Sequence, residues 1–523
     1  MQNSSRPRLA APVAAAGTAR ALSRNAPTAS PLSRLTGTDG SPPGMSLLTL
    51  SSALNMVSGY RARPVRKKRT RSREPRRMSA PTASTPTLIT LLRVYIPFAL
   101  AYVLSYLFRS VNSVIFPSLE QDIPELTAGD LGFLTSMYFL FFTAVQIPLG
   151  VMLDRYGARR VQSGLILFAA LGCIVFGAAT SVAGLAGGRA LIGLGVAGGL
   201  MAAIKAITVW YPPQRWSLMV GLHMAAGGLG SLVATHPVEA ALGLAGWRHV
   251  FFGLGAITVA VSAMLFFVVP ERGSATAAST PVGPQFRAVG HIMRDGYFWR
   301  LAPMVALQQA AFFAFQALWA GPWLRDVAGL DRAAITGQLF WLAVGMTASF
   351  VFTGWAAGAL AQRGVSYVAT GNAALALFLV VNASLIFTGL WRDASSTQVT
   401  ALMLAFGAGG AVGIIYFTPL QQAFPIELSG RATTSLNFVV FPAVLVGQWG
   451  QGKILDLWPK IGNGYDPEAY AVTAFLFVAL QAAALLWFLF SPARPAIRRS
   501  VDDSRHGATA PVAASAAGDP RRP

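Results

Sequence analysis

One arginine stands alone in an apolar stretch near the start of the hydrophobic part of the chain. Arg109 lies in the segment YLFRSVNSV, and Tyr106 precedes it by three residues. Residues three apart lie on the same face of a helix, so the phenol and the guanidinium can share one pocket. A guanidinium binds both oxygens of a carboxylate, phosphate or similar oxyanion through paired N–H donors. The segment therefore predicts an anion-binding site; the alternative is a side chain that only extends to the nearest polar surface.

Two more ionisable side chains lie within long apolar stretches, where charges are costly and are functional candidates. Lys205, in AAIKAITVW, can add positive potential to a central cavity, or it simply extends to the surface. His236, in ATHPVEAAL, can exchange a proton because histidine titrates near neutral pH, or it is merely solvated. We therefore predict Lys205 as a second cation of the anion site and His236 as a candidate for proton coupling.

Uncharged polar side chains in the second half of the chain can complete such a site. Gln308, Gln309 and Tyr416 lie in two apolar stretches and can hydrogen-bond a polar ligand, or they simply hold helices together. The apolar stretches of this half contain no acid, and the nearest ones, Asp326 and Asp331, fall in a connection. A ligand at the arginine would therefore meet a positive cavity, which favours anions over cations.

These side chains must be positioned by membrane-spanning helices. Of the 523 residues, 54% are hydrophobic and 12% are charged, whereas soluble domains have about a quarter charged residues. Many apolar stretches exceed about 18 residues, the length that crosses a bilayer as a helix. We predict an all-α membrane protein with twelve transmembrane helices in two pseudo-symmetric six-helix bundles. The spans are placed at 94–117, 131–151, 161–180, 184–210, 218–242, 249–269, 298–320, 336–360, 366–389, 397–422, 431–455 and 469–491.

An internal repeat divides these spans into two equal sets. Phe116-Pro117 ends the first span and Gly321-Pro322 ends the seventh, so that the two prolines lie 205 residues apart. Repeated halves are typical of secondary transporters, whose substrate site lies near mid-membrane between them. The predicted domains are a disordered basic tail or a start site placed too early (1–90), a first bundle (91–270), a cytoplasmic linker (271–297), a second bundle (298–491) and a disordered C-terminal tail (492–523).

Charged residues in the connections predict the orientation. Arginines follow the second, fourth and sixth spans, whereas the connection after the first span is acidic. Because basic connections stay in the cytoplasm, both termini are expected there. Much of the net charge of +21 lies in the N-terminal tail, for example in RARPVRKKRTRSREPRR. Such a run could suggest nucleic acid or anionic lipid, but a solvated tail beside a membrane is the simpler interpretation, and no nucleic-acid partner is expected.

Two motifs carry a resemblance to a known family. The stretch GVMLDRYGARR, residues 150–160, resembles the signature loop of the major facilitator superfamily: Gly, three residues, Asp-Arg, one residue, Gly, then basic residues. RALIGLGVA, residues 189–197, resembles the fourth-helix motif of that family. The first-span arginine after Tyr-x-x resembles the anion:cation symporter branch, which includes sugar-phosphate and carboxylate permeases. The resemblance covers about residues 90–492, and it implies that Arg189 serves proton coupling or helix packing.

The signature loop is expected to act as a gating latch. Its first glycine allows two helices to approach closely, and its acid can cap a helix end or pair with a basic group. Breaking such contacts at the cytoplasmic face would let the two halves rock. For the basic residues of the loop, a role in topology alone is the alternative. The predicted latch residues are Gly150, Asp154, Arg155, Gly157 and Arg159.

The resemblance implies a secondary active transporter that moves a small anionic solute by alternating access, in symport with protons. A monomer in a bacterial inner membrane is expected. A proton-coupled exporter of drugs or siderophores and a transporter-like solute sensor are the alternatives. The sequence shows no nucleotide-binding domain, no metal-ligand spacing and no nucleophile motif, so neither an enzyme activity nor a cofactor or metal is expected.

Overall fold

The computed structural model describes residues 88–212, 215–271, 282–425 and 428–492. The elements within these ranges are helices, and one isolated β-bridge joins Ile461 to Gly464. The two predicted tails lie almost wholly outside the described residues. We call residues 88–271 the first half and residues 282–492 the second half; the predicted domain boundaries stay a prediction.

The first half consists of seven α-helices that follow a short helical entry, among the residues described. The entry is α2 (Leu88–Thr90) with the π-helix η1 (Leu91–Tyr95). The α-helices are α3 (Ile96–Ser110), α4 (Asn112–Asp122), α5 (Ala128–Ala178), α6 (Val182–Val196), α7 (Gly199–Trp210), α8 (Trp216–Val233) and α9 (His236–Val268).

The second half begins with α10 (Val282–Met293), a helix inside the predicted linker. Its spans contain two irregular turns, the π-helix η3 (Phe315–Trp319) and the 3-10 helix η4 (Gly409–Ala411). The other helices are α11 (Gly296–Ala314), α12 (Ala320–Asp326), α13 (Arg332–Gln362), α14 (Tyr367–Ser384), α15 (Thr388–Arg392), α16 (Ser396–Ala408), α17 (Val412–Ile415), α18 (Phe417–Gln422), α19 (Ser429–Leu455) and α20 (Pro467–Phe490).

The lengths of the helices agree with the predicted spans, with one correction. Within the described residues, eleven helical segments are long and apolar enough to cross a membrane, and Leu218–Val233 is a shorter apolar helix. The fifth span, predicted to reach residue 242, ends at Val233 because Thr235 leaves the helical region and Pro237 starts a new helix. The residues that follow belong to α9, which changes direction at Gly246.

Two spans are continuous in α5 and change direction at Gly157. This residue has φ 79° and ψ 160°, a conformation that is essentially restricted to glycine. The backbone conformation of this turn therefore explains why the second glycine of the signature loop is a glycine. We call this side of the helices the Gly157 end, and the opposite side, where α4 ends and α5 begins, the Glu120 end.

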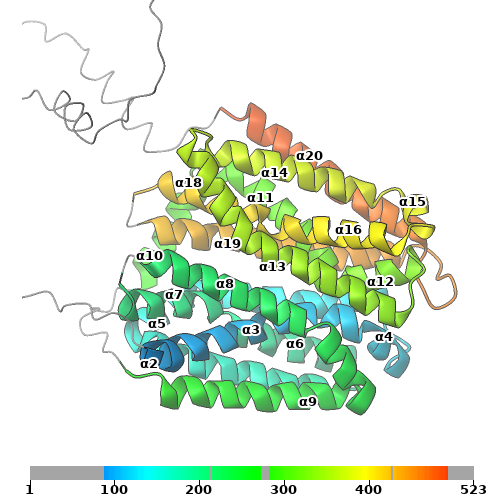
Figure 1. The fold of residues 1–523 in the computed structure, drawn as a ribbon, viewed down its shortest axis with the longest axis horizontal. Coiled ribbons are helices and arrows are strands. Elements are labelled where there is room, and N and C mark those ends of the chain that lie inside the picture. Colours follow the sequence, from blue (N-terminus) through cyan, green and yellow to red (C-terminus); the bar gives the residue numbers. More distant parts are fainter. Residues whose placement is uncertain (1–87, 213–214, 272–281, 426–427, 493–523) are drawn as a thin grey trace, which may run out of the picture. The chain divides into compact units, whose positions relative to one another are not determined.

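The two halves meet along two helix pairs. Helix α5 packs on α19, and α8 packs on α13, which lies beside it in Figure 1. Glycines allow the close approach of α5 and α19: a Cβ atom on Gly452 would lie 2.3 Å from the carbonyl oxygen of Ala128, and one on Gly132 would lie 2.7 Å from that of Gln448. Larger residues would force the helices apart, so these contacts fix how the halves dock near the Glu120 end.

Candidate functional site

Arg109 is buried among aromatic rings where the two halves meet. Its side chain lies near the end of α3, and the residue is 6% exposed. The guanidinium carbon lies 4.6 Å from the centre of the Tyr106 ring and 5.0 Å from that of Phe313, which belongs to α11 of the second half. Three rings from α5 surround it at 5.6 to 5.9 Å. We call the five rings the aromatic cage: Tyr106, Tyr138, Phe139, Phe142 and Phe313.

No carboxylate pairs with Arg109 among the residues that the structure describes. The ion pairs of these residues involve other basic side chains, and the Nε atom of Arg109 is buried without a hydrogen-bond partner. Ring faces attract a cation by about 0.5 to 2 kcal/mol each, which does not replace a counter-ion for a buried charge. The site is therefore suited to an anion that enters and completes the pairing.

Arg189 is also buried, but it is held by the protein itself. It is 0% exposed, and its Nη1 atom donates to the carbonyl oxygen of Phe108 at 3.0 Å. Its guanidinium lies over the rings of Phe176 and Phe251. The bond joins α6 to α3 one residue before Arg109. The geometry agrees with the packing role predicted for Arg189, and its role in proton coupling stays a prediction.

The predicted polar residues of the second half form a cluster of their own. Gln308 donates to the carbonyl oxygen of Gly409 at 2.9 Å, and the Tyr416 hydroxyl donates to Asn372 at 2.9 Å. The Oε1 atoms of Gln308 and Gln309 are buried without a hydrogen-bond partner. Among the described residues, no hydrogen bond joins this cluster to Arg109. Its free carbonyl oxygens can accept hydrogen bonds from the hydroxyl groups of a ligand.

A polar bridge next to Arg109 joins the two halves, and the sequence prediction missed it. Gln316 donates from Nε2 to the Ser110 hydroxyl at 2.8 Å, and its backbone carbonyl oxygen accepts from the Ser113 hydroxyl at 3.0 Å. Ser110 and Ser231 share a hydrogen bond of 2.9 Å. Gln316 lies in the π-helix η3, a widened turn that is common at functional sites. The serines after Arg109 in the first span were the available signal, but the π-helix has no signature in the sequence.

Lys205 lies with the latch rather than beside Arg109. Its Nζ atom pairs with Asp154 at 2.8 Å, an ion pair that ties α7 to the signature loop. Both residues are at the Gly157 end, where Lys205 and Arg155 line a cavity of about 330 Å³. The prediction that Lys205 contributes to the substrate site is not supported by this geometry, because hydropathy places a charge in a span without showing its partner.

Two further predicted latch residues, Gly157 and Arg159, line the same cavity together with Arg160. Arg160 pairs with Glu271 at 2.6 Å, and Arg159 lies 3.8 Å from the same carboxylate and donates to the carbonyl oxygen of Val269 at 3.1 Å. Gly150 is half-buried in α5, one helical turn before Asp154. These contacts hold the loop to the end of α9. Their role in gating stays a prediction.

His236, the predicted proton-coupling residue, is an exposed side chain at the start of α9. Its ring centre lies 5.7 Å from that of Phe340 of α13. The neighbouring acid, Glu239, pairs with Arg332 of the second half at 2.5 Å. His236 is thus at the Glu120 end and away from the aromatic cage. Its role in proton coupling stays a prediction.

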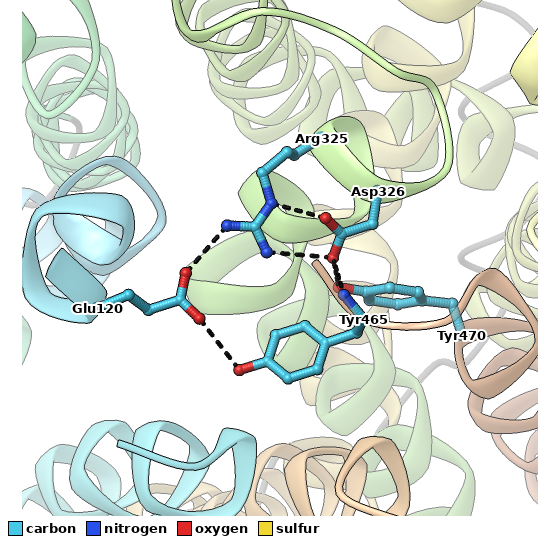
Figure 2. Close-up of polar contacts among 5 residues, drawn as sticks. All are labelled: Glu120, Arg325, Asp326, Tyr465 and Tyr470. Atoms are coloured by element: carbon cyan, nitrogen blue, oxygen red, sulfur yellow. Dashed lines mark hydrogen bonds and ion pairs between the residues drawn. The ribbon is translucent and has the colours of Figure 1, made fainter. Parts of the chain in front are cut away.

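A buried ion network joins the two halves at the Glu120 end (Figure 2). Arg325 pairs with Glu120 of the first half at 2.9 Å and with the neighbouring Asp326 at 2.6 Å. Asp326 also accepts from the Tyr470 hydroxyl at 2.8 Å and from the backbone N–H of Tyr465 at 3.0 Å. We call this network the Glu120 clasp: Glu120, Arg325, Asp326, Tyr465 and Tyr470.

The Tyr465 hydroxyl completes the clasp by donating to Glu120 at 3.3 Å. Burial, together with the negative charge of Glu120, raises the pKa of Tyr465, so the phenol keeps its proton and remains a donor. A second link lies nearby, where Asp456 accepts from the backbone N–H groups of Ala128 and Gly129 at 2.9 and 2.8 Å. This carboxylate of the second half therefore caps the N-terminus of α5 in the first half.

Apolar spanning helices in two halves, with an unpaired cation buried between them, define a membrane transport protein. A sequence model of the major facilitator superfamily matches residues 98–448, and the chain belongs to this family. The predicted family and the all-α fold of twelve transmembrane helices are thereby confirmed. Since the family consists of transporters, the chain is a multi-pass membrane transporter and not an enzyme.

Known relatives support this membership. The chain is 29% identical to a probable sulfoacetate transporter of Cupriavidus necator over 34% of this chain and 42% of that protein. It is 25% identical to a hexuronate transporter of Bacillus subtilis over 68% of this chain and 86% of that one. The matches to the first curated relatives thus span about half of their length or less.

A solved structure shows the same fold. A bacterial homolog of the human lysosomal transporter Spinster, in an inward-facing and unoccupied conformation, has a TM-score of 0.60 with this chain. The two proteins are 18% identical, and the match covers 77% of this chain and 97% of the homolog. At this identity the likeness concerns the fold alone.

Proposed function

We propose that the protein imports a small organic anion in symport with protons, by alternating access of a site between the two halves. The observation that carries the proposal is Arg109, a buried cation for which no described residue provides a carboxylate. The names of two relatives support it, because sulfoacetate carries a sulfonate and a carboxylate and hexuronates carry a carboxylate. An anion of either kind would pair with the guanidinium through two oxygens.

In the proposed site, Arg109 pairs with the anion, and the Tyr106 ring packs against the guanidinium. Gln308, Gln309 and Tyr416 of the second half contribute hydrogen bonds to the rest of the solute. Gln316 sets how closely the halves approach at the cage, because it bonds two serines of the first span. Lys205 belongs instead to the latch, together with Gly150, Asp154, Arg155, Gly157 and Arg159.

The proposed orientation places the Gly157 end in the cytoplasm and the Glu120 end outside. Basic residues gather at the Gly157 end, and such residues are retained in the cytoplasm. Both termini are then cytoplasmic, and a bacterial inner membrane is the proposed location. The Glu120 clasp and the Asp456 cap join the halves on the outer side, which corresponds to a transporter that is closed to the outside. Import would require this side to open and the latch side to close in turn.

Binding of named anions to the purified protein tests the proposal. We expect sulfoacetate or galacturonate to raise the melting temperature, and we expect Arg109→Ala to abolish this rise, because the anion then has no cation to pair with. Arg363→Ala is the matched control, since Arg363 is exposed at the Gly157 end and should leave binding unchanged. An undiminished rise in Arg109→Ala would remove this residue from the site.

Uptake into proteoliposomes separates the alternatives. We expect an imposed proton gradient to drive accumulation of an anion that binds. Binding without transport would favour a solute sensor. A melting temperature that rises with cationic drugs but not with the anions would favour a drug exporter of the same fold.

A further inference from the structure

A buried histidine that the sequence prediction did not single out lies close to the aromatic cage. His223 belongs to α8 and is 1% exposed. Its Nε2 atom lies 3.2 Å from the carbonyl oxygen of Gly199 in α7. A carbonyl oxygen only accepts hydrogen bonds, so Nε2 carries the hydrogen and Nδ1 carries a lone pair. This Nδ1 atom is buried and has no hydrogen-bond partner among the described residues.

Two tyrosines connect this imidazole to Arg109. The His223 ring stacks on Tyr102, with ring centres 4.3 Å apart and an angle of 21° between the planes. The Tyr102 ring meets the edge of Tyr106 at 5.1 Å, and Tyr106 lies 4.6 Å from the Arg109 guanidinium. The four side chains form a continuous row from α8 to the cage. Because all four side chains are buried, a charge on the imidazole interacts electrostatically with the Arg109 guanidinium through a poorly hydrated interior.

Among the residues that the structure describes, no carboxylate contacts His223. Helices α3, α7, α9 and α13 pack against α8. The ring faces Tyr95 of η1 and Tyr102 of α3, with Tyr106 and Arg109 beyond Tyr102. From α7 it meets a carbonyl group, and Lys205 of that helix is engaged with Asp154. Other titratable groups of α9 and α13 lie at the Glu120 end: Glu239, His236, His249 and Arg248 of α9, the last with Asp122, and Arg332 of α13. Arg93 of η1 and Arg215 before α8 are exposed.

A proton on Nδ1 would therefore create a second buried positive charge, separated from the Arg109 guanidinium by two tyrosine rings. That state is unfavourable while the cage is empty, because like charges in a poorly hydrated interior repel. An anion at Arg109 reverses the balance, since it attracts both cations. Proton and anion then increase each other's affinity by the same factor, as linkage requires.

We propose that His223 takes up the proton that accompanies the anion. The inference rests on the proposed function and names the group that couples it to protons. In this scheme a proton from the outside binds the Nδ1 lone pair when the anion occupies the cage. With a monoanion such as galacturonate, the imidazolium and the anion together add no net charge to the site; with a dianion such as sulfoacetate, Arg109 and the imidazolium together balance its two charges. Release of the anion at the cytoplasmic side leaves the His223 imidazolium and the Arg109 guanidinium without a counter-ion. The proton then leaves Nδ1 for the cytoplasm.

Proton uptake during binding tests this role directly. Galacturonate, or sulfoacetate, is added to the purified protein in weak buffer with a pH-indicator dye, and binding is followed separately by calorimetry. Wild-type protein is expected to take up about one proton per anion. In the pH range where the empty protein lacks this proton and the complex holds it, the affinity should fall by up to about tenfold per pH unit as the proton becomes scarce.

The variant His223→Gln keeps an N–H donor for the Gly199 carbonyl but has no titratable nitrogen. We expect it to bind the anion without proton uptake and with an affinity that does not depend on pH. In proteoliposomes it should exchange labelled for unlabelled anion but lose accumulation driven by a proton gradient. His249→Gln is the control, because His249 is an exposed histidine of the same half and should behave as wild type.

Three results would overturn the inference. Undiminished proton uptake in His223→Gln would assign the proton to another group. Wild-type binding with no proton uptake and no pH dependence would refute the coupling role of His223 even if the variant failed to fold, and it would leave the anion site intact. Absence of anion binding to the wild-type protein would refute the proposed function, and the inference with it.

Discussion

Two arginines where the halves meet differ in how their positive charge is balanced. Arg325 pairs with two carboxylates, Glu120 and Asp326, so its charge is balanced inside the protein. Arg109 meets five ring faces instead, and no described residue supplies it with an acid. A buried charge without a partner lowers stability. We therefore interpret Arg325 as part of the scaffold and Arg109 as a residue whose partner is the transported solute.

This contrast predicts opposite effects of the same substitution. Arg109→Met should raise the stability of the empty protein by about 1 kcal/mol or more, because an apolar side chain of similar length replaces an unpaired buried charge. Arg325→Met should lower it by about 3 to 5 kcal/mol, because two carboxylates lose their partner. Thermal denaturation in detergent without added anion measures both changes. A lower melting temperature for Arg109→Met would mean that the cage stabilises the cation without a ligand.

The sequence alone predicted Arg109 and Tyr106, since an arginine stands out in an apolar helix and its neighbour follows from helical spacing. It did not predict the partner of Lys205, because Asp154 lies in the signature loop, far away in sequence, and only the packing of α7 beside α5 brings the two together. His223 was missed for a similar reason. The position of a histidine in an apolar stretch does not predict its spatial neighbours, and only the structure shows the stacking on Tyr102.

At the scale of elements, the predicted spans were reliable where the helices are straight and poor where they break. Hydropathy measures how apolar a stretch is, and it does not detect a change in backbone direction. The fifth span thus ended at Val233, although the apolar sequence continues into α9. The π-helix η3, which presents Gln316 to Ser110, depends on a hydrogen-bond register that composition does not reveal.

The turn inside α5 offers a test of how backbone geometry explains a motif residue. Gly157→Ala should destabilise the protein by about 1 to 3 kcal/mol, because its φ of 79° and ψ of 160° are accessible almost only to glycine. No atom lies within 4 Å of an added Cβ at this position, so the loss would come from the backbone and not from a clash.

Gly164→Ala is the matched control for this substitution. Gly164 lies in the same helix, and no atom lies within 4 Å of a Cβ added there either. It has helical geometry, so alanine should be neutral or slightly stabilising. Thermal denaturation of both variants separates the two effects. Equal melting temperatures would show that the turn tolerates alanine and that the fold does not require glycine at this position.

At the scale of the whole transporter, the links between the halves at the Glu120 end differ in how much they contribute to stability. The pair between Arg332 and Glu239 is partly exposed, and such pairs contribute little. The Glu120 clasp is largely buried and shares its hydrogen bonds among five residues (Figure 2), so its members depend on one another. Only one of the five, Glu120, belongs to the first half. The charge of this carboxylate is therefore the point at which the clasp can be weakened without disturbing either half.

Glu120→Gln should favour opening of the outer side, because the amide still accepts a hydrogen bond but no longer attracts the Arg325 guanidinium as an ion. A loss of about 1.4 kcal/mol would raise the open population about tenfold. The measurement is the rate at which a membrane-impermeant maleimide labels Val114→Cys, because Val114 is only 5% exposed and lines a cavity of about 220 Å³ at the Glu120 end. Glu125→Gln, an exposed acid of the same connection, should leave the rate unchanged. Equal labelling of Glu120→Gln and the parent would show that the α5–α19 contact, with its glycines and the Asp456 cap, keeps this side closed without the clasp.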